Sequence, residues 1–341
     1  MVYSHNAPFR ADVVGSYLRP AELKAAGLHV ITDGEFRRGW WHFDFMWGFN
    51  GVDHAAAAHR VAFHDEVTPA DTATVTGRIS GENHPFVEHF KFVKQFEDEN
   101  TVARQTMPSP AQTRFVLTGN AAAYPYDEFY KNDDELTADI VAAYRQVIAD
   151  LYAAGCRNVQ FDDCTWTRLC DASVRERLGW SDEDALRLQQ ENLDVINAVI
   201  ADQPDDLVIN THVCRGNFHS TWLSSGGHAP VAAKLFGEEN VDAYYLEFDD
   251  DRSGDFAPLA EVSGDKKVVL GLITSKKPDL EDPDTIKARI QEAAQYIPLD
   301  RLCLSTQCGF ASTQEGNKLT EDQQWAKIAL VQSIAKDVWG E

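Results

Sequence analysis

Short apolar runs alternate along the chain with longer stretches of helical periodicity. Each run ends abruptly in polar or charged residues, as buried parallel strands do, and eight of them lie at 13–16, 30–33, 106–108, 159–163, 207–214, 243–248, 268–274 and 302–308. Helix-like segments separate most of the runs, among them 137–154, 181–201, 282–297 and 322–339. Eight β/α units within 341 residues predict an α/β fold of the (β/α)8 TIM-barrel type.

One segment, at about 50–100, breaks this alternation. It carries β-branched residues at alternating positions and a turn-like Ser-Gly-Glu-Asn at 80–83. We therefore predict a β-hairpin-like insertion there, after the second strand. No internal repeat, low-complexity tract or linker marks a domain boundary, so residues 1–341 are predicted to form a single domain.

The chain is strongly acidic, with 54 acidic and 31 basic residues and a net charge of −23. This charge repels nucleic acid phosphates and anionic membrane surfaces, so neither is an expected partner. No apolar run reaches the roughly 20 residues of a membrane helix, and the first residues lack a signal-peptide pattern. We expect a cytoplasmic protein that acts on small molecules, and a homo-oligomer is compatible with the sequence.

Polar side chains gather where the predicted strands end, at Ser16, Asp33, Glu35, Asp162, Asp163, His212, Cys214, Glu247, Thr274 and Cys308. In a (β/α)8 barrel, catalytic groups project from these carboxyl ends. His212 and Cys214 are two residues apart in a predicted strand, so both side chains face one side and can bind one ion. An H-x-C pair alone is weak evidence, because a buried cysteine is most often a small apolar residue. Cys308 and Glu247, at two further strand ends, complete a His/Cys/Cys/Glu set that favours zinc.

Several of these segments together resemble the catalytic domain of the cobalamin-independent methionine synthase family, in a single-barrel form. The resemblance extends over essentially the whole chain. It rests on VGS at 14–16, TDGEFRRGW at 32–40, QFDD at 160–163, NTHVCRGN at 210–217, LEFDDDRSGDFAPL at 246–259, GLITSKKPDLED at 271–282 and LSTQCGFAS at 304–312.

The resemblance implies two sets of site residues. The family's zinc ligands correspond to His212, Cys214, Glu247 and Cys308, the same four residues that the strand ends indicate. The groups that hold the amino and carboxylate groups of homocysteine correspond to Ser16, Glu35 and Asp162. Two carboxylates can neutralise an ammonium group, and a hydroxyl can receive a carboxylate. Taken singly, these three residues and Asp33 or Asp163 are equally well explained as helix caps or turn residues.

The implied activity is a zinc-dependent thiol alkyl transfer, with homocysteine as the first candidate acceptor. Zinc would lower the pKa of the incoming thiol, whose sulfur would displace a weak ligand, for which we name Glu247, and attack a methyl group. Asp162 is the second residue expected to take part in catalysis.

Residues around these positions carry secondary expectations. The side chains of Arg37, Arg38, Trp40 and Trp41 could line a pocket for the methyl donor, or form a surface helix with an aromatic anchor. Arg215 and Asn217 could orient metal ligands. His219 and His228 have no partner readable from the sequence.

One position departs from the family pattern. The family has a histidine after the seventh strand that serves as the acid for the folate leaving group, whereas Thr274 stands there in this chain. Threonine cannot act as a general acid near neutral pH. Either another group supplies the proton, or the methyl donor is not a folate but a corrinoid or another donor.

Three other functions compete with this interpretation. An epoxyalkane–coenzyme M transferase would use a sulfonate thiol, which Glu35 and Asp162 would repel. A lyase related to uroporphyrinogen decarboxylase would need no metal ligands. A non-catalytic zinc-binding protein would leave the predicted pocket carboxylates unexplained.

Overall fold

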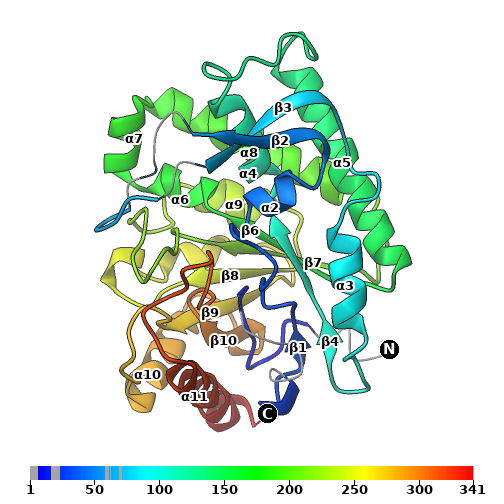
Figure 1. The fold of residues 1–341 in the computed structure, drawn as a ribbon. Coiled ribbons are helices and arrows are strands. Elements are labelled where there is room, and N and C mark those ends of the chain that lie inside the picture. Colours follow the sequence, from blue (N-terminus) through cyan, green and yellow to red (C-terminus); the bar gives the residue numbers. More distant parts are fainter. Residues whose placement is uncertain (1–6, 17–23, 58–60, 62, 69–70, 341) are drawn as a thin grey trace.

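In the computed structural model, residues 7–16, 24–57, 61, 63–68 and 71–340 are described. A parallel six-stranded sheet in the order β10-β9-β8-β7-β6-β5 forms the centre of the molecule (Figure 1). The strands are β5 (Gln105–Pro108), β6 (Asn158–Asp163), β7 (Val208–Val213), β8 (Ala243–Glu247), β9 (Lys267–Ile273) and β10 (Leu302–Thr306). Nearly every position in them is buried, and apolar residues are frequent in them although polar side chains such as Gln160 and Asn210 are buried among them.

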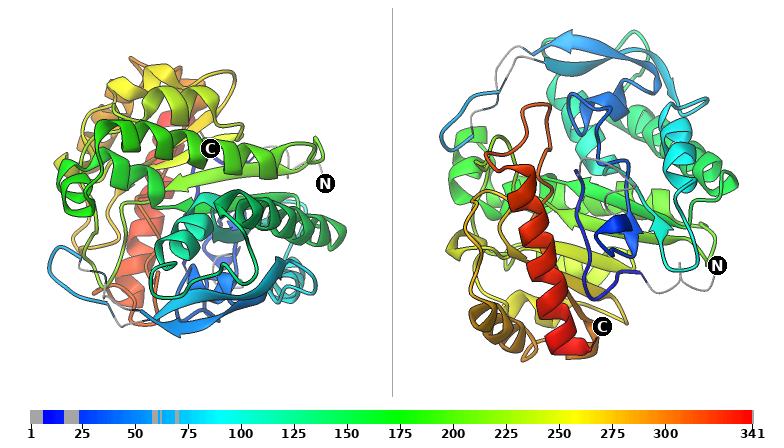
Figure 2. Two further views of the ribbon diagram at one scale, coloured as in Figure 1. Left: turned by 90° about the horizontal axis from the view of Figure 1, so that it is seen from above. Right: turned by 60° about the horizontal axis from the view of Figure 1, so that its bottom comes forward.

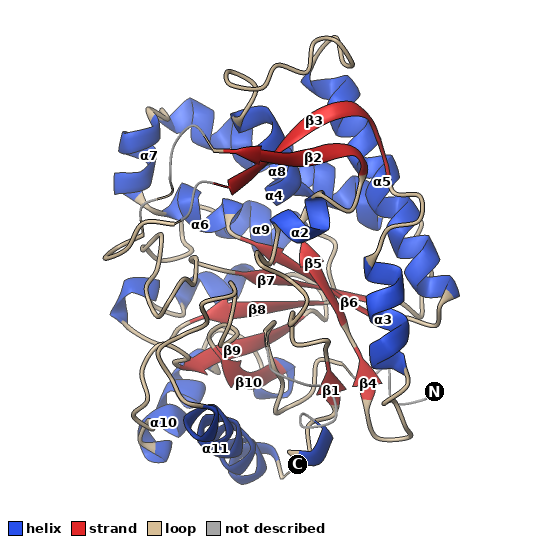
Figure 3. Cartoon of the chain, viewed as in Figure 1, coloured by secondary structure: helices blue, strands red, loops and turns tan. Residues whose placement is uncertain are grey.

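Helices surround the sheet, as the alternating pattern predicts (Figure 3). They are α2 (Phe43–Met46), α3 (Phe86–Lys94), α4 (Pro110–Gly119), α5 (Asp133–Ala153), α6 (Thr165–Cys170), α7 (Ala172–Leu178), α8 (Asp182–Ile200), α9 (Ala232–Glu238), α10 (Pro283–Ala293) and α11 (Glu321–Trp339), with 3₁₀ turns η2 (Asp251–Ser253), η3 (Ala257–Glu261) and η4 (Leu299–Arg301). The long helices begin at side-chain caps, such as Asn132 for α5, Ser181 for α8 and Thr320 for α11. None of the described helices is long and apolar enough to cross a lipid bilayer.

The sheet continues beyond both of its edges in short pieces. β1 (Val30–Ile31) pairs in parallel with β4 (Val102–Ala103), which lies just before β5 in the chain. At the other edge, Ala11 forms a parallel bridge with Leu304 of β10. Between these two pieces the structure shows a side-chain hydrogen bond, from Thr32 Oγ1 to the Gly15 carbonyl at 3.3 Å, rather than a backbone ladder. The fold is therefore α/β with a parallel sheet, as predicted. Closure of this sheet into a barrel between β1 and the segment at 11–16 stays a prediction.

The predicted strand at 13–16 is reduced to that single bridge at Ala11. Asp12 uses its carboxylate to accept the N–H groups of Phe9 and Val13, and Gly15 has a φ of 56°, so the backbone leaves the extended conformation.

An antiparallel pair, β2 (Asn50–Ala56) and β3 (Asp71–Ser80), lies between β1 and β4 in the chain and packs over α5 and α4 (Figure 2). The hairpin ends earlier than the expected 100, because α3 follows it. Phe86, Phe90 and Val93 recur at helical spacing in α3 and are all buried. Apolar residues at this spacing indicate a helix, which the hairpin interpretation of 50–100 overlooked.

A charged side chain, Arg104, occupies the interior between the strands. Its Nη2 lies 3.1 Å from Asp12 Oδ1 and 2.6 Å from the Tyr245 hydroxyl. Nη1 donates to the Val13 carbonyl, and Nε donates to Asn158 Oδ1. The guanidinium group thus joins the segment at 11–14 to β6 and β8 by charge and hydrogen bonds.

Replacing Arg104 by methionine is expected to lower the free energy of unfolding by about 3–5 kcal/mol, because Asp12 would keep a buried charge without its partner. Urea unfolding of the purified variant measures this change. The double variant Arg104→Met/Asp12→Asn should recover part of the loss. Equal losses in the single and double variants would contradict the importance of the charge pair.

Candidate functional site

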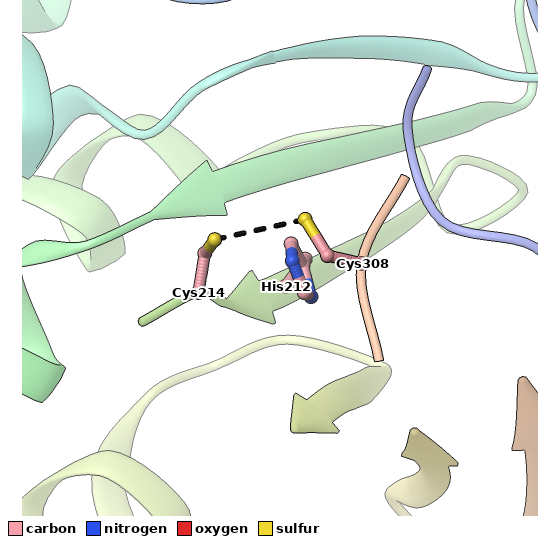
Figure 4. Close-up of side chains that lie close together, drawn as sticks. All are labelled: His212, Cys214 and Cys308. Atoms are coloured by element: carbon pink, nitrogen blue, oxygen red, sulfur yellow. Dashed lines mark hydrogen bonds between the residues drawn. The ribbon is translucent and has the colours of Figure 1, made fainter. Parts of the chain in front are cut away.

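Three side chains from two distant parts of the chain form a cluster at the carboxyl ends of the strands. His212 is near the end of β7, Cys214 directly follows this strand, and Cys308 follows β10. Their potential ligand atoms lie within 4.8 Å of one another, and all three residues are buried. The sulfur atoms of Cys214 and Cys308 are 3.8 Å apart, with His212 beside them (Figure 4). The structure thus brings together three of the four residues predicted to bind zinc.

The histidine of this cluster is oriented for metal binding. His212 Nδ1 donates to the Tyr245 carbonyl at 3.2 Å, while its Nε2 is buried without a hydrogen-bond partner. A metal-binding histidine characteristically uses one nitrogen for such a backbone bond and the other for the metal. The donor set of one imidazole and two thiols suits zinc better than magnesium or calcium.

A third thiol adjoins the cluster. Cys164, the residue after β6, packs with Cys214 and Cys308 beside Trp41. The neighbouring Cys164 thiol and burial raise the pKa of Cys214, and Cys214 and burial raise the pKa of Cys308. Zinc binding to these sulfurs would therefore release protons. Sequence reasoning left Cys164 unassigned, although it follows a predicted strand end as the other site residues do.

Glu247, the fourth predicted ligand, lies beside the cluster with its oxygens in other contacts. Its Oε1 accepts the Arg215 N–H at 2.7 Å, and its Oε2 lies 3.3 Å from Arg252 Nη2 and 3.5 Å from Lys276 Nζ. Although burial opposes ionisation, Lys276 and Arg252 hold the pKa of Glu247 below its usual value. The sequence analysis did not assign a role to either cation, although both lie in segments that resemble the family, because their contacts with Glu247 form only in the folded chain.

The residues predicted to bind the amino-acid thiol line the same small cavity as the cluster. This cavity has a volume of about 20 Å³ and is lined by Val14, Gly15, Ser16, Glu35, Trp41, Asp162, His212, Cys214, Asn217, Cys308, Gly309 and Ser312. That volume holds about one water molecule. An amino-acid-sized thiol must therefore displace side chains when it enters.

The two carboxyl groups of this cavity differ from their neighbours in the sequence. Asp33 accepts a hydrogen bond from the Glu35 N–H, and Asp163 accepts one from the Thr165 N–H. Both carboxylates therefore stabilise the turn that follows them. Glu35 and Asp162 instead face the cavity. Burial raises the pKa of both, and their mutual repulsion raises the pKa of Glu35 further.

Glu35 adopts a strained backbone conformation, and Ser16 has a free hydroxyl hydrogen. The φ of Glu35 is 59°, a left-handed value that is uncommon for a residue with a side chain and is found mainly at functional sites. The Glu35 carboxylate accepts a hydrogen bond from Thr106 Oγ1 at 3.1 Å. Ser16 Oγ accepts the Ala311 N–H at 2.9 Å, so its own hydrogen can be donated to a ligand.

A much larger cavity of about 590 Å³ adjoins the small one, and Trp41 and Asn217 line both. Trp40, Phe43, Phe115, Trp180 and Phe218 supply most of its aromatic wall. This volume is that of a small-molecule site.

The remaining polar candidates have other contacts. Arg38 is buried and contacts Thr106, Asp33 and Glu35, and Arg37 lies over the Phe92 ring, so neither lines the large cavity. Asn217 donates to the Gly309 carbonyl at 2.8 Å.

Two histidines and one threonine lie outside the cluster. His219 pairs with Glu66, and His228 is buried against Phe236 and Phe248. Thr274 lines neither cavity, since its N–H bonds Glu281 and its hydroxyl accepts the Lys276 N–H.

The family model for the catalytic domain of the cobalamin-independent synthases matches residues 87–330 of this chain. The uncharacterised protein YxjH of Bacillus subtilis is 42% identical, with 98% of this chain and 95% of YxjH covered. A solved structure of a putative vitamin-B12-independent methionine synthase from Listeria monocytogenes is 36% identical and has a TM-score of 0.77, with 98% of this chain and 99% of that chain covered.

A more distant structure shares the fold. The B12-independent methionine synthase from Shewanella sp. W3-18-1, solved with selenomethionine, is 21% identical, with 93% of this chain and 84% of that chain covered and a TM-score of 0.68. The family match covers most of the chain, and the nearer relatives span nearly all of it. The chain therefore belongs to the cobalamin-independent methionine synthase family, as a catalytic-domain form.

Proposed function

We propose that the protein is a zinc-dependent thiol methyltransferase that transfers a methyl group to homocysteine and forms methionine. The observation that carries this proposal is that the His212–Cys214–Cys308 cluster and the carboxyl groups of Glu35 and Asp162 line one cavity. The cluster suits a thiol-activating metal, and the carboxyls suit an ammonium group. An amino-acid thiol has both groups.

His212, Cys214 and Cys308 would hold the zinc, and Glu247 is proposed as the fourth, exchangeable ligand. Zinc bound there would lower the pKa of the acceptor thiol and make it a nucleophile at neutral pH. Arg252 and Lys276 keep Glu247 ionised, and they would bind its carboxylate when the acceptor thiol takes its position on the zinc. We further propose that the site lies at the mouth of a closed (β/α)8 barrel.

The acceptor would be oriented by three residues of the small cavity. Glu35 and Asp162 would bind the ammonium group, and the Ser16 hydroxyl would donate to the carboxylate. Both carboxyl groups must ionise for this, and the incoming positive charge compensates the repulsion and burial that raise their pKa values. A sulfonate thiol such as coenzyme M has no ammonium group to offer, so this pocket favours homocysteine.

The methyl donor would occupy the large aromatic cavity, next to the acceptor across Trp41 and Asn217. Thr274 supplies no acid to this cavity. The donor is therefore proposed to be one whose leaving group needs no proton, such as a methylated corrinoid or a sulfonium compound, rather than a folate.

The purified protein is expected to contain about one zinc per chain, and Cys214→Ser or Cys308→Ser should abolish both zinc binding and methyl transfer. Metal analysis together with X-ray absorption at the zinc edge, with and without homocysteine, measures occupancy and any new zinc–sulfur contact. Cys303→Ser is the matched control, because Cys303 is buried among Val14, Tyr245 and Val269 instead. Full activity in a zinc-free preparation would refute the proposed function.

Removing one pocket carboxylate, by Glu35→Gln or Asp162→Asn, is expected to weaken homocysteine binding by about 2–5 kcal/mol, the cost of losing one side of a desolvated charge pair. Calorimetric titration of the zinc-loaded protein measures the change. The matched control ligand is 4-mercaptobutanoate, which keeps the thiol and the carboxylate but lacks the ammonium group and should be little affected.

The same pair of thiols tests the ionisation of the pocket. Because the pKa values of Glu35 and Asp162 are raised, the protonated forms persist to higher pH than usual, and homocysteine should bind more tightly relative to 4-mercaptobutanoate as the pH rises. If Glu35→Gln and Asp162→Asn weaken the binding of homocysteine and 4-mercaptobutanoate equally, the two carboxylates stabilise the fold and do not bind the ammonium group.

Turnover with 5-methyltetrahydrofolate and homocysteine is expected to be slow, because a positioned acid contributes on the order of 10²–10⁴ in rate. Parallel assays of methionine formation from this folate, methylcobalamin and a sulfonium donor compare the classes, and Thr274→His tests whether an acid restores folate use. Wild-type turnover of several per second with the folate would show that another residue supplies the proton.

A further inference from the structure

In the described part of the chain, Arg168 is the one lysine or arginine in the wall of the large cavity. Arg168, on α6, lies with its guanidinium carbon 4.3 Å over the Phe115 ring. Its Nε is buried without a hydrogen-bond partner. Among the residues that the structure describes, no carboxylate forms an ion pair with it. Arg168 is partly buried and has no direct ion-pair partner, so an anionic ligand in the cavity would gain a charge-assisted contact with it.

The carboxylates that could neutralise Arg168 are committed elsewhere. Asp163, the last residue of β6, accepts hydrogen bonds from Ser109 and Thr165. Of the two acidic residues in the cavity wall, Asp71 is bound by His54 and Trp40.

The other acidic wall residue, Asp133, is bound by the Tyr126 hydroxyl. None of these three carboxylates has a hydrogen bond or an ion pair to Arg168. Arg168 therefore forms no direct ion pair within the part of the chain that the structure describes, and only through-space attraction from Asp163 and Cys164 supports its charge.

Two neutral polar groups of the same cavity also lack partners. His42 Nδ1 and Gln112 Oε1 are both buried without hydrogen bonds. Burial and the nearby Arg168 lower the pKa of His42 to about 3, so the ring is uncharged at neutral pH. His42 and Gln112 thus line the cavity as uncharged side chains, and Arg168 is the cationic residue of the wall.

The rest of the wall selects the shape of the ligand body. The His42 ring lies tilted against the rings of Trp41 and Phe43, with ring centroids 4.6 and 3.9 Å away. Phe115 meets Trp180 edge to face. Aromatic faces of this kind pack best against a flat, largely apolar body.

We propose that Arg168 is the anion-binding residue of the large cavity, and that the ligand of this cavity carries an anionic group that binds this guanidinium while its body packs on the aromatic wall. That the ligand is the methyl donor rests on the proposed function. The anion preference of the cavity rests only on Arg168 and its surroundings.

Two fluorescent probes that differ by a single anion test this directly on the zinc-loaded protein. 8-Anilinonaphthalene-1-sulfonate carries a sulfonate, and N-phenyl-1-naphthylamine has the same aromatic body without it. Titrations of wild type and Arg168→Gln, Arg168→Lys and Arg114→Gln give a Kd for each probe. Arg114 is the matched control, because it also belongs to the α4–α6 region but is paired with Glu191 and does not line the cavity.

In Arg168→Gln the sulfonate probe should bind at least about tenfold more weakly, while the neutral probe keeps its affinity. Arg168→Lys should retain part of the preference, and Arg114→Gln should leave both probes unchanged. Equal weakening of both probes would assign Arg168 to packing on Phe115, and unchanged binding of both would place the anion site elsewhere. Either result overturns the inference.

The same samples separate this inference from the proposed function. Zinc content and homocysteine coordination are measured on each variant. Retained zinc and thiol binding without an anion preference would refute the role of Arg168 alone. If the wild-type protein shows no zinc-dependent methyl transfer but keeps the anion preference, the proposed function is refuted and the role of Arg168 stands.

Discussion

The ion pair between Arg104 and Asp12 organises the interior on which the site depends. A guanidinium group inside a sheet must satisfy all of its donors, and here its partners come from β6, β8 and the irregular segment at 11–14. This segment has a single backbone bridge to β10. The side-chain contacts of Arg104 therefore hold it in place, as backbone hydrogen bonds hold the other strands. Because Gly15 and Ser16 directly follow it, the buried pair also positions one wall of the small cavity.

Carboxylates at the site fall into two electrostatic classes. Glu247 and Asp249 contact Arg252 and Lys276, and these cations keep both ionised despite burial. Glu35 and Asp162, at the same end of the sheet, have raised pKa values. The first pair is held as anions by its cations, whereas the second pair needs a positive charge nearby to ionise near neutral pH. Environment rather than residue type separates the two roles.

The repeating part of the fold could be predicted because buried parallel strands are rich in apolar residues, and the runs from 159 onward match β6 to β10 closely. The predicted strand at 13–16 is only a single bridge at Ala11. The spacing of apolar residues cannot show this, because it depends on the hydrogen bonds that the Asp12 carboxylate accepts. The helix α3 was overlooked within the expected hairpin, although Phe86 and Phe90 carry its periodicity.

At the candidate site, His212, Cys214 and Cys308 could be identified from their positions at the ends of predicted strands. His212 and Cys214 are also two residues apart, so they share one face of a strand. These positions could not show that Arg252 and Lys276 hold Glu247, or that Arg168 forms no ion pair with a described residue. Those facts depend on loops and helices that meet only after folding.

Two glycines beside the acceptor pocket restrict how this protein can change its acceptor. A Cβ at Gly309 would lie 2.3 Å from Ser16 Oγ and 2.5 Å from Ser16 N, and one at Gly15, whose φ is 56°, would lie 3.2 Å from Glu35 Oε1. Backbone therefore touches the very groups proposed to hold the amino acid. A substitution of Glu35 or Asp162 could therefore change the acceptor that binds, whereas a side chain at either glycine would push against the groups that shape the pocket.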